Sequence, residues 1–484
     1  MLINPKLLKA LELIEEISPG SYIVGGFIRD HFINRSHIAD VDVAVAGNGF
    51  SLARQISDRL GDEASFAPLD EINGCGRLVF NSPDHEIMDI TTLKAPTIDE
   101  DLSRRDFTIN AIAVRVSDFI CSGLELLIDP LNGLQDIKHG HIRACSDNAF
   151  SDDPLRIFRA YRFTTQLGFS IEAKSLLLME QAVQGLSEIS GERIRDELYL
   201  ILAEPNSFGT LIAMEELGAI TLLFPELKRM KGASQNRFHD LDVWNHSLKV
   251  VEQIEFLINN LESFFPEHKD RILNYLRHEI CPGRNRPWLV KLAGLFHDSG
   301  KPLTSTVDSI GNIHFYGHEK VSRQIIENSI VKLKMSNRES EFVLKLVGSH
   351  MRLSSLTVSE PSRKFLFRVS DRFQEDIIGM SLIFIADLRS SCGPARKQSH
   401  MDNALIGVKT LFDYFFELPG KPVAPLVNGN DIITYFNISP GPQIGYVLKR
   451  IREKQALGEI ASRQDALHEA RRIIERLEPG TSSQ

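Results

Sequence analysis

Two short stretches, VGGFIRD at residues 24–30 and ADVDVAV at residues 39–45, decide how the N-terminal part of this chain folds. The second stretch alternates polar and apolar residues, which is the period of a half-buried strand. The first stretch begins at the end of a short strand predicted at residues 22–24, and its two glycines lead into a predicted helix. Another alternating strand is predicted at EIMDITTL, residues 86–93. Residues 1–145 are therefore expected to form a small unit of helices around a mixed sheet.

The alternation also brings acidic side chains together. Residues two apart on a strand point to the same side, so Asp40 and Asp42 present two carboxylates to one place. Such a pair suits two Mg²⁺ ions about 3.5–4 Å apart, which activate an attacking hydroxyl and stabilise a leaving pyrophosphate. Asp89, in the strand 86–93, is a candidate third carboxylate, with an ordinary exposed strand aspartate as the alternative.

The glycines between the two strands have a matching use. Gly25 and Gly26 lack side chains and precede a helix N-terminus, so their amides are able to approach a triphosphate closely. Arg29 lies one turn into that helix. Taken alone, each motif is equally compatible with a role that binds no nucleotide: the glycines with an ordinary turn, and the aspartates with a solvent-facing pair on an edge strand. Their occurrence together in this order favours a nucleotide site.

The composition sets limits on the function. The chain has 484 residues, of which 43% are apolar and 25% charged, as is typical of a soluble globular protein of about three domains. Its 55 basic and 64 acidic residues give a net charge of −9, which argues against a surface coated in basic residues for gripping nucleic acid. A local basic groove stays compatible with that sum, because the placement of charge matters more than its total.

The cysteines and the hydropathy pattern bear on the compartment. Five scattered cysteines, none in a Cys-x-x-Cys pair, argue against a disulfide framework and favour a reducing compartment. Residues 1–17 predict an amphipathic helix and lack the apolar core of a signal peptide. No run of about 18 or more apolar residues is present, so no membrane span is predicted. We therefore expect a cytoplasmic protein without a membrane partner.

From about residue 146 the pattern becomes helical. Asp153 followed by Pro154 is typical of a helix start, with an acidic N-cap and proline at the first helical position. The segment 192–204 repeats apolar residues at helical spacing, and nearly everything that follows is expected to be helical to about residue 476. The residues expected on one face of that segment are Ile194, Leu198, Ile201 and Leu202.

A second set of candidate ligands lies in this helical part. Imidazoles and carboxylates bind first-row metals, and inward-facing side chains of several helices are able to meet in a bundle core. A histidine followed by an aspartate directly after the apolar run LAGLF is costly to bury unless the pair is neutralised or bound to metal. A helical domain that retains histidines for structure alone is the alternative. The set comprises His246, His297, Asp298, His318, His350 and Asp387.

Four motifs of the first half resemble one family. VGGFIRD, the Asp40-Val41-Asp42 unit, RRDFTINA (residues 104–111) and DDPLR (residues 152–156) resemble the motifs of class II tRNA nucleotidyltransferases. These include CCA-adding enzymes and bacterial poly(A) polymerases, within the DNA polymerase beta superfamily. The resemblance covers about residues 20–225.

The resemblance implies roles for individual residues. Asp40 and Asp42 would hold the metals, while Asp153 and Arg156 would read the incoming base; Asp89 stays the candidate third catalytic carboxylate from the strand pattern alone. Residues three apart on a helix share a face, so the arginine is able to donate to the acceptor edge of cytosine while the aspartate accepts from its amino group. The residues implied to bind the nucleotide are Gly25, Gly26, Arg29, Arg104, Arg105, Asp106, Asn110, Asp153, Arg156 and Arg159.

Two departures from the family pattern are present. Asp152 stands where the family carries glutamate. Only residues 95–99 connect TTLK to Glu100, where CCA-adding relatives carry a longer flexible loop that is linked to switching from C to A addition. Enzymes that add only CC resemble the shortened form. The sequence therefore favours a CC-adding enzyme, with a separate A-adding enzyme acting on the same tRNA.

The histidine set resembles the HD phosphohydrolase domain in the form that holds two metals. This resemblance implies a divalent transition metal of unknown identity and a phosphatase or phosphodiesterase activity. Lys301, close to the His297-Asp298 pair in the sequence, is expected to be a solvated charge at a helix end.

Together these expectations give an α+β chain. A nucleotidyltransferase head (1–145) with a mixed sheet is followed by an all-α neck for nucleotide recognition and RNA binding (146–230), an HD domain (231–400) and a helical tail (401–484). Residues 441–476 have an excess of three positive charges, which fits either a tRNA contact or a solvated helix.

The predicted activity is template-independent addition of CCA, or only CC, to the 3′ end of tRNA. It would use CTP and ATP with two Mg²⁺ ions and release pyrophosphate. The alternatives are a poly(A) polymerase, or a metal-dependent HD phosphohydrolase whose head only binds RNA.

Overall fold

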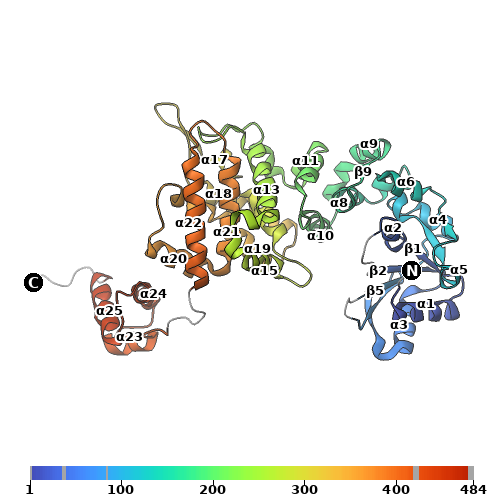
Figure 1. Ribbon diagram of the computed structural model, residues 1–484, viewed down its shortest axis with the longest axis horizontal. Coiled ribbons are helices and arrows are strands. Elements are labelled where there is room, and N and C mark those ends of the chain that lie inside the picture. Colours follow the sequence, from blue (N-terminus) through green and yellow to red (C-terminus); the bar gives the residue numbers. More distant parts are fainter. Residues whose placement is uncertain (1–2, 35–39, 83–85, 418–423, 478–484) are drawn as a thin grey trace, which may run out of the picture. The chain divides into compact units, whose positions relative to one another are not determined.

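The computed structural model describes residues 3–34, 40–82, 86–417 and 424–477 (Figure 1). The chain forms two compact units, Met1–Leu223 and Phe224–Gln484. The predicted division into four domains is finer than this and stays a prediction.

The first unit is built on a seven-stranded sheet of order β3-β4-β5-β2-β1-β6-β7. Only β2 and β5 run parallel, and the other neighbours pair antiparallel, so the sheet is mixed, as predicted. The strands predicted at residues 22–24, 40–45 and 86–93 are confirmed. The strands are β1 (Tyr22–Val24), β2 (Asp40–Val45), β3 (Ala64–Asp70), β4 (Cys75–Phe80), β5 (Ile87–Thr92), β6 (Ala113–Arg115) and β7 (Leu127–Ile128).

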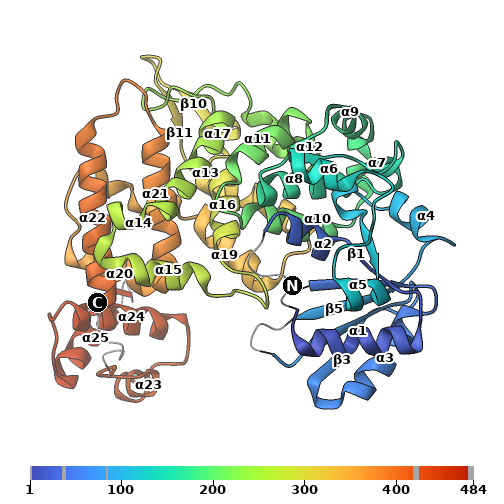
Figure 2. The same ribbon diagram turned by 45° about the vertical axis from the view of Figure 1, so that its right-hand side comes forward.

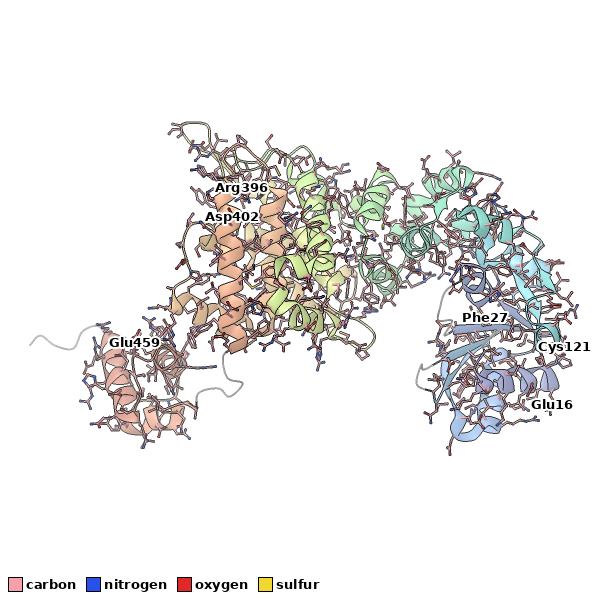
Figure 3. The ribbon with its side chains drawn as sticks, in the orientation of Figure 1. Glu16, Phe27, Cys121, Arg396, Asp402 and Glu459 are labelled. Atoms are coloured by element: carbon pink, nitrogen blue, oxygen red, sulfur yellow. The ribbon has the colours of Figure 1, made fainter. Side chains whose placement is uncertain are left out.

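Helices cover both sides of this sheet. In Figures 1 and 2, α1 (Pro5–Ile17) and α3 (Gly49–Leu60) lie on one side and α2 (Gly26–Phe32) on the other. Phe27 of α2, labelled in Figure 3, is buried and meets the ring of Phe119 edge-on at 5.7 Å. The glycine turn before α2 therefore lies at the end of β1, beside β2. The other helices of this part are α4 (Ile98–Ser103), α5 (Val116–Ser122), α6 (Gly133–His139) and α7 (Ala149–Asp152).

The helical end of the first unit follows the predicted periodicity. All four apolar residues expected on one face of the segment 192–204 are buried on α10 (Gly191–Leu202). The expected helix start at Asp153-Pro154 is shifted, because α8 begins at Arg156 after a turn in which Asp153 Oδ1 accepts from the Leu155 amide at 3.2 Å. The helices are α8 (Arg156–Leu167), α9 (Ala173–Ala182), α10, α11 (Phe208–Glu216) and α12 (Ala219–Leu223).

The second unit is a bundle of helices. In it α13 (Val243–Asn259) packs against α16 (Pro287–Phe296) and α21 (Ile377–Ser390), and α21 is buried along almost its whole length. In Figures 1 and 2, α21 and α22 run side by side. The remaining helices are α14 (Leu261–Phe264), α15 (Lys269–Arg277), α17 (Lys301–Thr304), α18 (His318–Lys332), α19 (Asn337–Val347), α20 (Arg363–Phe373) and α22 (Gln398–Glu417).

The helices α23 (Gly429–Phe436), α24 (Pro442–Ala456) and α25 (Arg463–Leu477) share a small core of their own around Val447 and Ile451. No helix among the described residues is long and apolar enough to cross a membrane.

Several short elements were not predicted. The hairpin of β10 (Ser305–Val307) and β11 (Ile313–Phe315) interrupts a region expected to be helical, and β8 (His141–Ile142) pairs with β9 (Ser170–Ile171). Strands of two or three residues are too short to show a period. The 3₁₀ helices are η1 (Gly61–Glu63), η2 (Thr108–Asn110), η3 (Val183–Glu188), η4 (Pro225–Met230), η5 (Pro266–His268), η6 (His350–Thr357) and η7 (Gln374–Asp376).

Candidate active sites of the two units

The predicted carboxylates of the first unit lie together on the sheet. Asp42 of β2 is the register partner of Asp89 of β5, so the two side chains are neighbours on one face. Asp40 lies two residues before Asp42 and shares that face. Burial, and after it the charge of Asp89, raises the pKa of Asp42 to about 6, against an opposing effect of Arg105. A divalent cation would relieve this accumulation of negative charge, and carboxylate oxygens are the ligands that Mg²⁺ prefers.

The glycine turn lies directly against this carboxylate pair. Gly25 has a φ of +79°, and a Cβ at this position would come within 3.2 Å of Asp42 Oδ2 and 3.6 Å of Arg105 Nη1. Only glycine therefore fits here. The Gly25 amide already donates to the Ile112 carbonyl at 3.2 Å, so the amides that are open to an anion begin at Gly26, in the first turn of α2. Triphosphate binding at this turn stays a prediction.

Four of the predicted nucleotide-binding residues form one chain of hydrogen bonds. Arg29 Nη1 donates to Asn110 Oδ1 at 2.6 Å, and Asn110 Nδ2 donates to Asp106 Oδ1 at 3.1 Å. Arg159 then holds Asp106 Oδ2 with Nε at 2.9 Å and Nη2 at 2.6 Å. Burial opposes the charge of Asp106, but Arg159 and the Asn110 hydrogen bond outweigh it and hold the pKa of Asp106 below its usual value. This chain connects α2 and η2 with α8.

The chain of hydrogen bonds and ion pairs continues into residues that were not predicted. Glu197 of α10 lies 3.5 Å from Arg159 and accepts from Arg162 Nε at 2.8 Å. Two guanidinium groups lie over the Phe163 ring: Cζ of Arg162 is 4.5 Å from the ring centroid, and Cζ of Arg29 is 5.1 Å from it. A signal for Glu197 was available in the sequence, because this acid falls on the apolar face of its helix beside Leu198.

The two residues expected to read the base are not paired with each other. Asp153 Oδ2 accepts from Arg193 at 2.8 Å. Arg156 donates to the Arg104 carbonyl at 2.8 Å and to the Arg105 carbonyl at 3.2 Å, so it connects α8 to the segment after α4. Their role in base reading stays a prediction.

The remaining two arginines of that segment also have partners. Arg104 donates to the Lys94 carbonyl at 2.9 Å, and Arg105 pairs with Asp101 at 3.1 Å. Arg77 was not predicted and forms a bidentate pair with Asp89, with distances of 2.7 and 2.8 Å.

In the second unit the structure brings all six predicted ligands into two adjoining groups. Within each group, one ligand atom from each residue lies within 4.8 Å of the others. Asp298 joins them, since its Oδ2 lies 3.1 Å from His297 Nε2 and its Oδ1 lies 3.2 Å from His318 Nε2. The first group is His246, His297 and Asp387, and the second is Asp298, His318 and His350.

Three of the histidine rings are held by a hydrogen bond at Nδ1, the nitrogen that does not face the cluster. The Nδ1 atoms of His297, His318 and His350 each lie 2.7 to 2.8 Å from a backbone carbonyl three residues earlier. These bonds fix the tautomer and leave Nε2 available as a ligand atom. Burial, with the charge of His297, lowers the pKa of His350 to about 3, so this ring stays neutral.

Several buried atoms of the cluster form no hydrogen bond of good geometry, although some of them lie within ion-pair distance of a neighbour. They include both nitrogens of His246, His297 Nε2, Asp298 Oδ2 and Asp387 Oδ1. Buried polar atoms without partners are rare and costly, and a bound ion is one explanation for them. The donor set of imidazoles and carboxylates fits a first-row divalent metal.

Lys301 belongs to this site, contrary to the expectation of a solvated charge. Its side chain is buried, and Nζ lies 2.5 Å from Asp298 Oδ2 and 2.7 Å from Gln235 Oε1. His239 is a further residue that was not predicted, with its ring 4.6 Å from that of His246. Burial opposes the charge of Asp298, but His297 and Lys301 outweigh it and hold the pKa of Asp298 well below its usual range.

Comparisons with known proteins agree with this geometry. Residues 21–143 match the poly(A) polymerase head domain, residues 168–231 match the probable RNA- and SrmB-binding site of polymerase A, and residues 243–377 match the HD domain. The matches define the class as a nucleotidyltransferase head joined to an RNA-binding region and an HD domain.

Relatives over nearly the full length make the assignment more specific. The chain is 30% identical to the A-adding tRNA nucleotidyltransferase of Deinococcus radiodurans over 454 residues, which cover 93% of this chain and 94% of the relative. It is also 30% identical to the CC-adding enzyme of Geobacter sulfurreducens, over 92% of this chain and 90% of the relative. The chain belongs to the tRNA nucleotidyltransferase family, and the predicted family is confirmed.

The fold is shared with solved structures. A CCA-adding enzyme in complex with CTP superposes with a TM-score of 0.63 at 22% identity, covering 98% of this chain and 96% of that chain. The predicted fold class of a mixed-sheet head followed by helical regions is thus confirmed.

Proposed function

We propose that this enzyme adds the two cytidines, and not the terminal adenosine, to the 3′ end of tRNA. The relatives do not decide the product, because one A-adding and one CC-adding enzyme are equally similar at 30% identity. The observation that carries the proposal is the connection between β5 and α4.

This connection is short and held at both ends. β5 ends at Thr92, and α4 begins at Ile98 with Thr97 as its N-cap. Between them, the Lys94 amide donates to Asp101 Oδ1 at 2.8 Å, while the Lys94 carbonyl accepts from Arg104 at 2.9 Å. A connection of this length has no room for the longer flexible loop whose counterpart in the family is linked to the change from C to A. This argues for an enzyme that stops after CC.

The chain's own residues would divide the work of the transfer. When bound at Asp40, Asp42 and Asp89, Mg²⁺ would activate the attacking 3′-hydroxyl and stabilise the leaving pyrophosphate. The first turn of α2 would bind the triphosphate. The hydrogen-bonded chain from Arg29 to Arg159 would hold the pocket for sugar and phosphates in one geometry, since most of its members are fixed by more than one hydrogen bond.

Asp153 and Arg156 would select the base without a nucleic-acid template. Asp153 has both carboxylate oxygens in contact with protein donors, the Leu155 amide and Arg193. Its oxygens each have a second lone pair, which leaves an acceptor for the amino group of cytosine. Arg156 would donate to the acceptor edge of the same base.

Incorporation assays test this proposal directly. Purified protein is incubated with tRNA lacking its CCA end and with each labelled nucleotide. We expect two cytidines from CTP, no adenosine on a tRNA that already ends in CC, and no incorporation by Asp42→Ala. Adenosine on the CC-ending tRNA would refute the CC-adding proposal. Absence of any incorporation would refute nucleotide transfer.

A second activity is favoured by the buried unpartnered atoms of the second unit. We propose that the HD site binds two divalent transition metals and hydrolyses a phosphate ester or 2′,3′-cyclic phosphate. His297→Ala and Asp298→Ala are expected to abolish 2′,3′-cyclic phosphodiesterase activity supported by Mn²⁺, Ni²⁺ or Co²⁺. Wild-type protein that is inactive with every divalent metal would leave this cluster a structural one.

The partners and the location follow from the proposed product. A CC-adding enzyme requires a separate A-adding enzyme to complete the same tRNA. The basic excess of residues 441–476 is proposed to contact the tRNA backbone. A cytoplasmic location suits the five free cysteines, because reducing compartments keep thiols unpaired.

A further inference from the structure

One rung of the sheet carries three charged side chains in a row. Arg77 of β4 is the register partner of Asp89 of β5, and Asp89 is in turn the register partner of Asp42 of β2. Neighbouring strands lie about 4.7–4.9 Å apart, so side chains of one rung on one face are direct neighbours. Arg77 is therefore the next side chain beyond the carboxylates that are proposed to hold the metal.

The contact between Arg77 and Asp89 uses both carboxylate oxygens. Nε donates to Oδ1 at 2.7 Å and Nη2 donates to Oδ2 at 2.8 Å. The two side chains are one third and one fifth exposed, so solvent screens the pair only in part. A bidentate arginine fixes the plane of a carboxylate as well as its position. Asp89 is thus held from β4, the strand that flanks β5 on the side opposite to β2 and Asp42.

The charges around the site are unequal in number. Asp40, Asp42 and Asp89 would supply three negative charges, and Arg77 is bonded to one of these carboxylates, Asp89, through both oxygens. Arg105 also acts on Asp42 but makes its ion pair with Asp101. Arg77 therefore offsets the charge of Asp89, one of the carboxylates that would attract a divalent ion.

We propose that Arg77 is a positioning residue that acts as an internal counter-cation: it orients Asp89 and keeps the affinity of the three carboxylates for a free divalent ion low. The ion then enters together with the nucleotide, because a triphosphate brings the negative charge that Arg77 has neutralised. This second step rests on the proposed nucleotide transfer, whereas the first does not.

Mn²⁺ binding to the full-length protein, measured by electron paramagnetic resonance after metal removal, tests the proposal. Arg77→Met is expected to bind Mn²⁺ at the head about tenfold more tightly than wild type in the absence of nucleotide, because a fixed positive charge has gone. Arg77→Lys keeps a cation and is expected to stay within about threefold of wild type. Mn²⁺ binding to the head is defined as the part of the total Mn²⁺ binding that is lost in Asp42→Asn. This definition separates it from Mn²⁺ binding to the HD site.

Further measurements make the test specific. Arg59→Met, at an exposed arginine of the same unit paired with Glu16, should leave Mn²⁺ binding unchanged. The non-hydrolysable analogue CMPCPP should tighten Mn²⁺ binding to wild type at least tenfold, and Arg77→Met clearly less, because its site no longer carries a competing cation. In CTP incorporation, Arg77→Met should lose kcat, and Arg77→Lys should recover only part of it, because lysine does not hold a carboxylate by both oxygens.

The outcomes separate the proposal from the alternatives. An Arg77→Met site that binds Mn²⁺ equally or more weakly would overturn it, as would a wild-type site that does not tighten with CMPCPP. Circular dichroism checks the fold of each variant. Should Arg77→Met not fold, Arg77→Gln takes its place with the same expectation. Failure of wild type to incorporate cytidine would refute the proposed function and leave the nucleotide-free Mn²⁺ comparison valid.

Discussion

Asp106 is a single side chain on which both the fold and the nucleotide pocket depend. It is buried and accepts from the Phe107 amide, from Asn110 and twice from Arg159. The arginine comes from α8 and the aspartate from the segment before η2, so their pair connects the sheet to the helical end of the first unit. Removal of the negative charge would leave Arg159 facing a partner that no longer compensates it.

We expect Asp106→Asn to lower the free energy of unfolding by about 2 kcal/mol at pH 7, a value reduced because Arg159 is about one third exposed. The pKa of Asp106 lies below its usual value in the folded state. Its charge therefore stabilises the fold above the unfolded pKa, about 4, and this contribution is lost as the pH falls through the folded pKa. The difference between wild type and variant should shrink from pH 7 to pH 3, as measured by calorimetry.

Asp147→Asn is the matched control. Its pair with Lys174 lies at 2.5 Å, but both side chains are about two thirds exposed. Exposed pairs contribute little, so this variant should stay within about 0.5 kcal/mol of wild type. An Asp106→Asn variant that is as stable as this control would contradict the role given to the buried pair.

At the scale of the elements, the connection from β5 to α4 contains the N-cap of α4 and is also the segment on which the proposed CC specificity rests. Thr97 Oγ1 accepts from the Glu100 amide at 3.3 Å and caps α4. Thr97→Ala should lower the free energy of unfolding of the first unit by about 1 kcal/mol, because a helix amide loses its acceptor. Ser51→Ala, at an exposed position in the first turn of α3 whose side chain is not the cap, should change it by less than about 0.5 kcal/mol. Equal effects of the two changes would argue against a cap at Thr97.

The sequence predicted the elements of the head well because they carry a clear period. The alternation around Asp40 and Asp42 predicts a strand and also predicts that both carboxylates share a face, as observed. Arg77 could not be found in this way. Its role depends on which residue of β5 lies opposite it, and the register between two strands is set by the whole sheet rather than by either strand.

In the helical unit too, the sequence predicted which residue types form the site but not the surroundings of each side chain. Its six ligands were found because histidines and aspartates in that order are unusual in apolar helices, and the structure brings them together. Lys301 was taken for a solvated charge, since a lysine at a helix end is normally exposed. Its burial comes from contacts with Asp298 and Gln235, and Gln235 lies 66 positions earlier in the chain.

At the scale of the whole molecule, the net charge of −9 has a local meaning. Part of the acidic excess lies in two clusters, the carboxylates on the sheet, where Asp89 raises the pKa of Asp42, and the carboxylates among the histidines of the helical unit. A negative total therefore does not contradict an RNA substrate, because the acids are gathered at sites for metal and nucleotide. It does predict that both units respond to divalent ions.

This response can be followed in one unit at a time. The chain has only two tryptophans, Trp244 and Trp288, and both are buried in the second unit. Tryptophan fluorescence therefore reports the unfolding of the HD region and not of the head. Mn²⁺ at about 100 times its dissociation constant should stabilise this unit by about 2.7 kcal/mol per site, which raises its melting temperature by several degrees. EDTA should reverse the rise.

Another group of possible metal ligands in the same unit serves as a control for the HD ligands. His268 and Asp413, 2.9 Å apart, form a third group with Glu267 that could hold an ion, but His268 has a hydrogen-bond partner in the structure and no unpartnered buried atom. His246→Ala should abolish most of the Mn²⁺ effect on the fluorescence melt, whereas His268→Gln should leave it unchanged. A metal effect that survives His246→Ala and disappears in His268→Gln would move the site to the third group, Glu267, His268 and Asp413. No metal effect in wild type would mean that the unpartnered atoms of the cluster are tolerated without an ion.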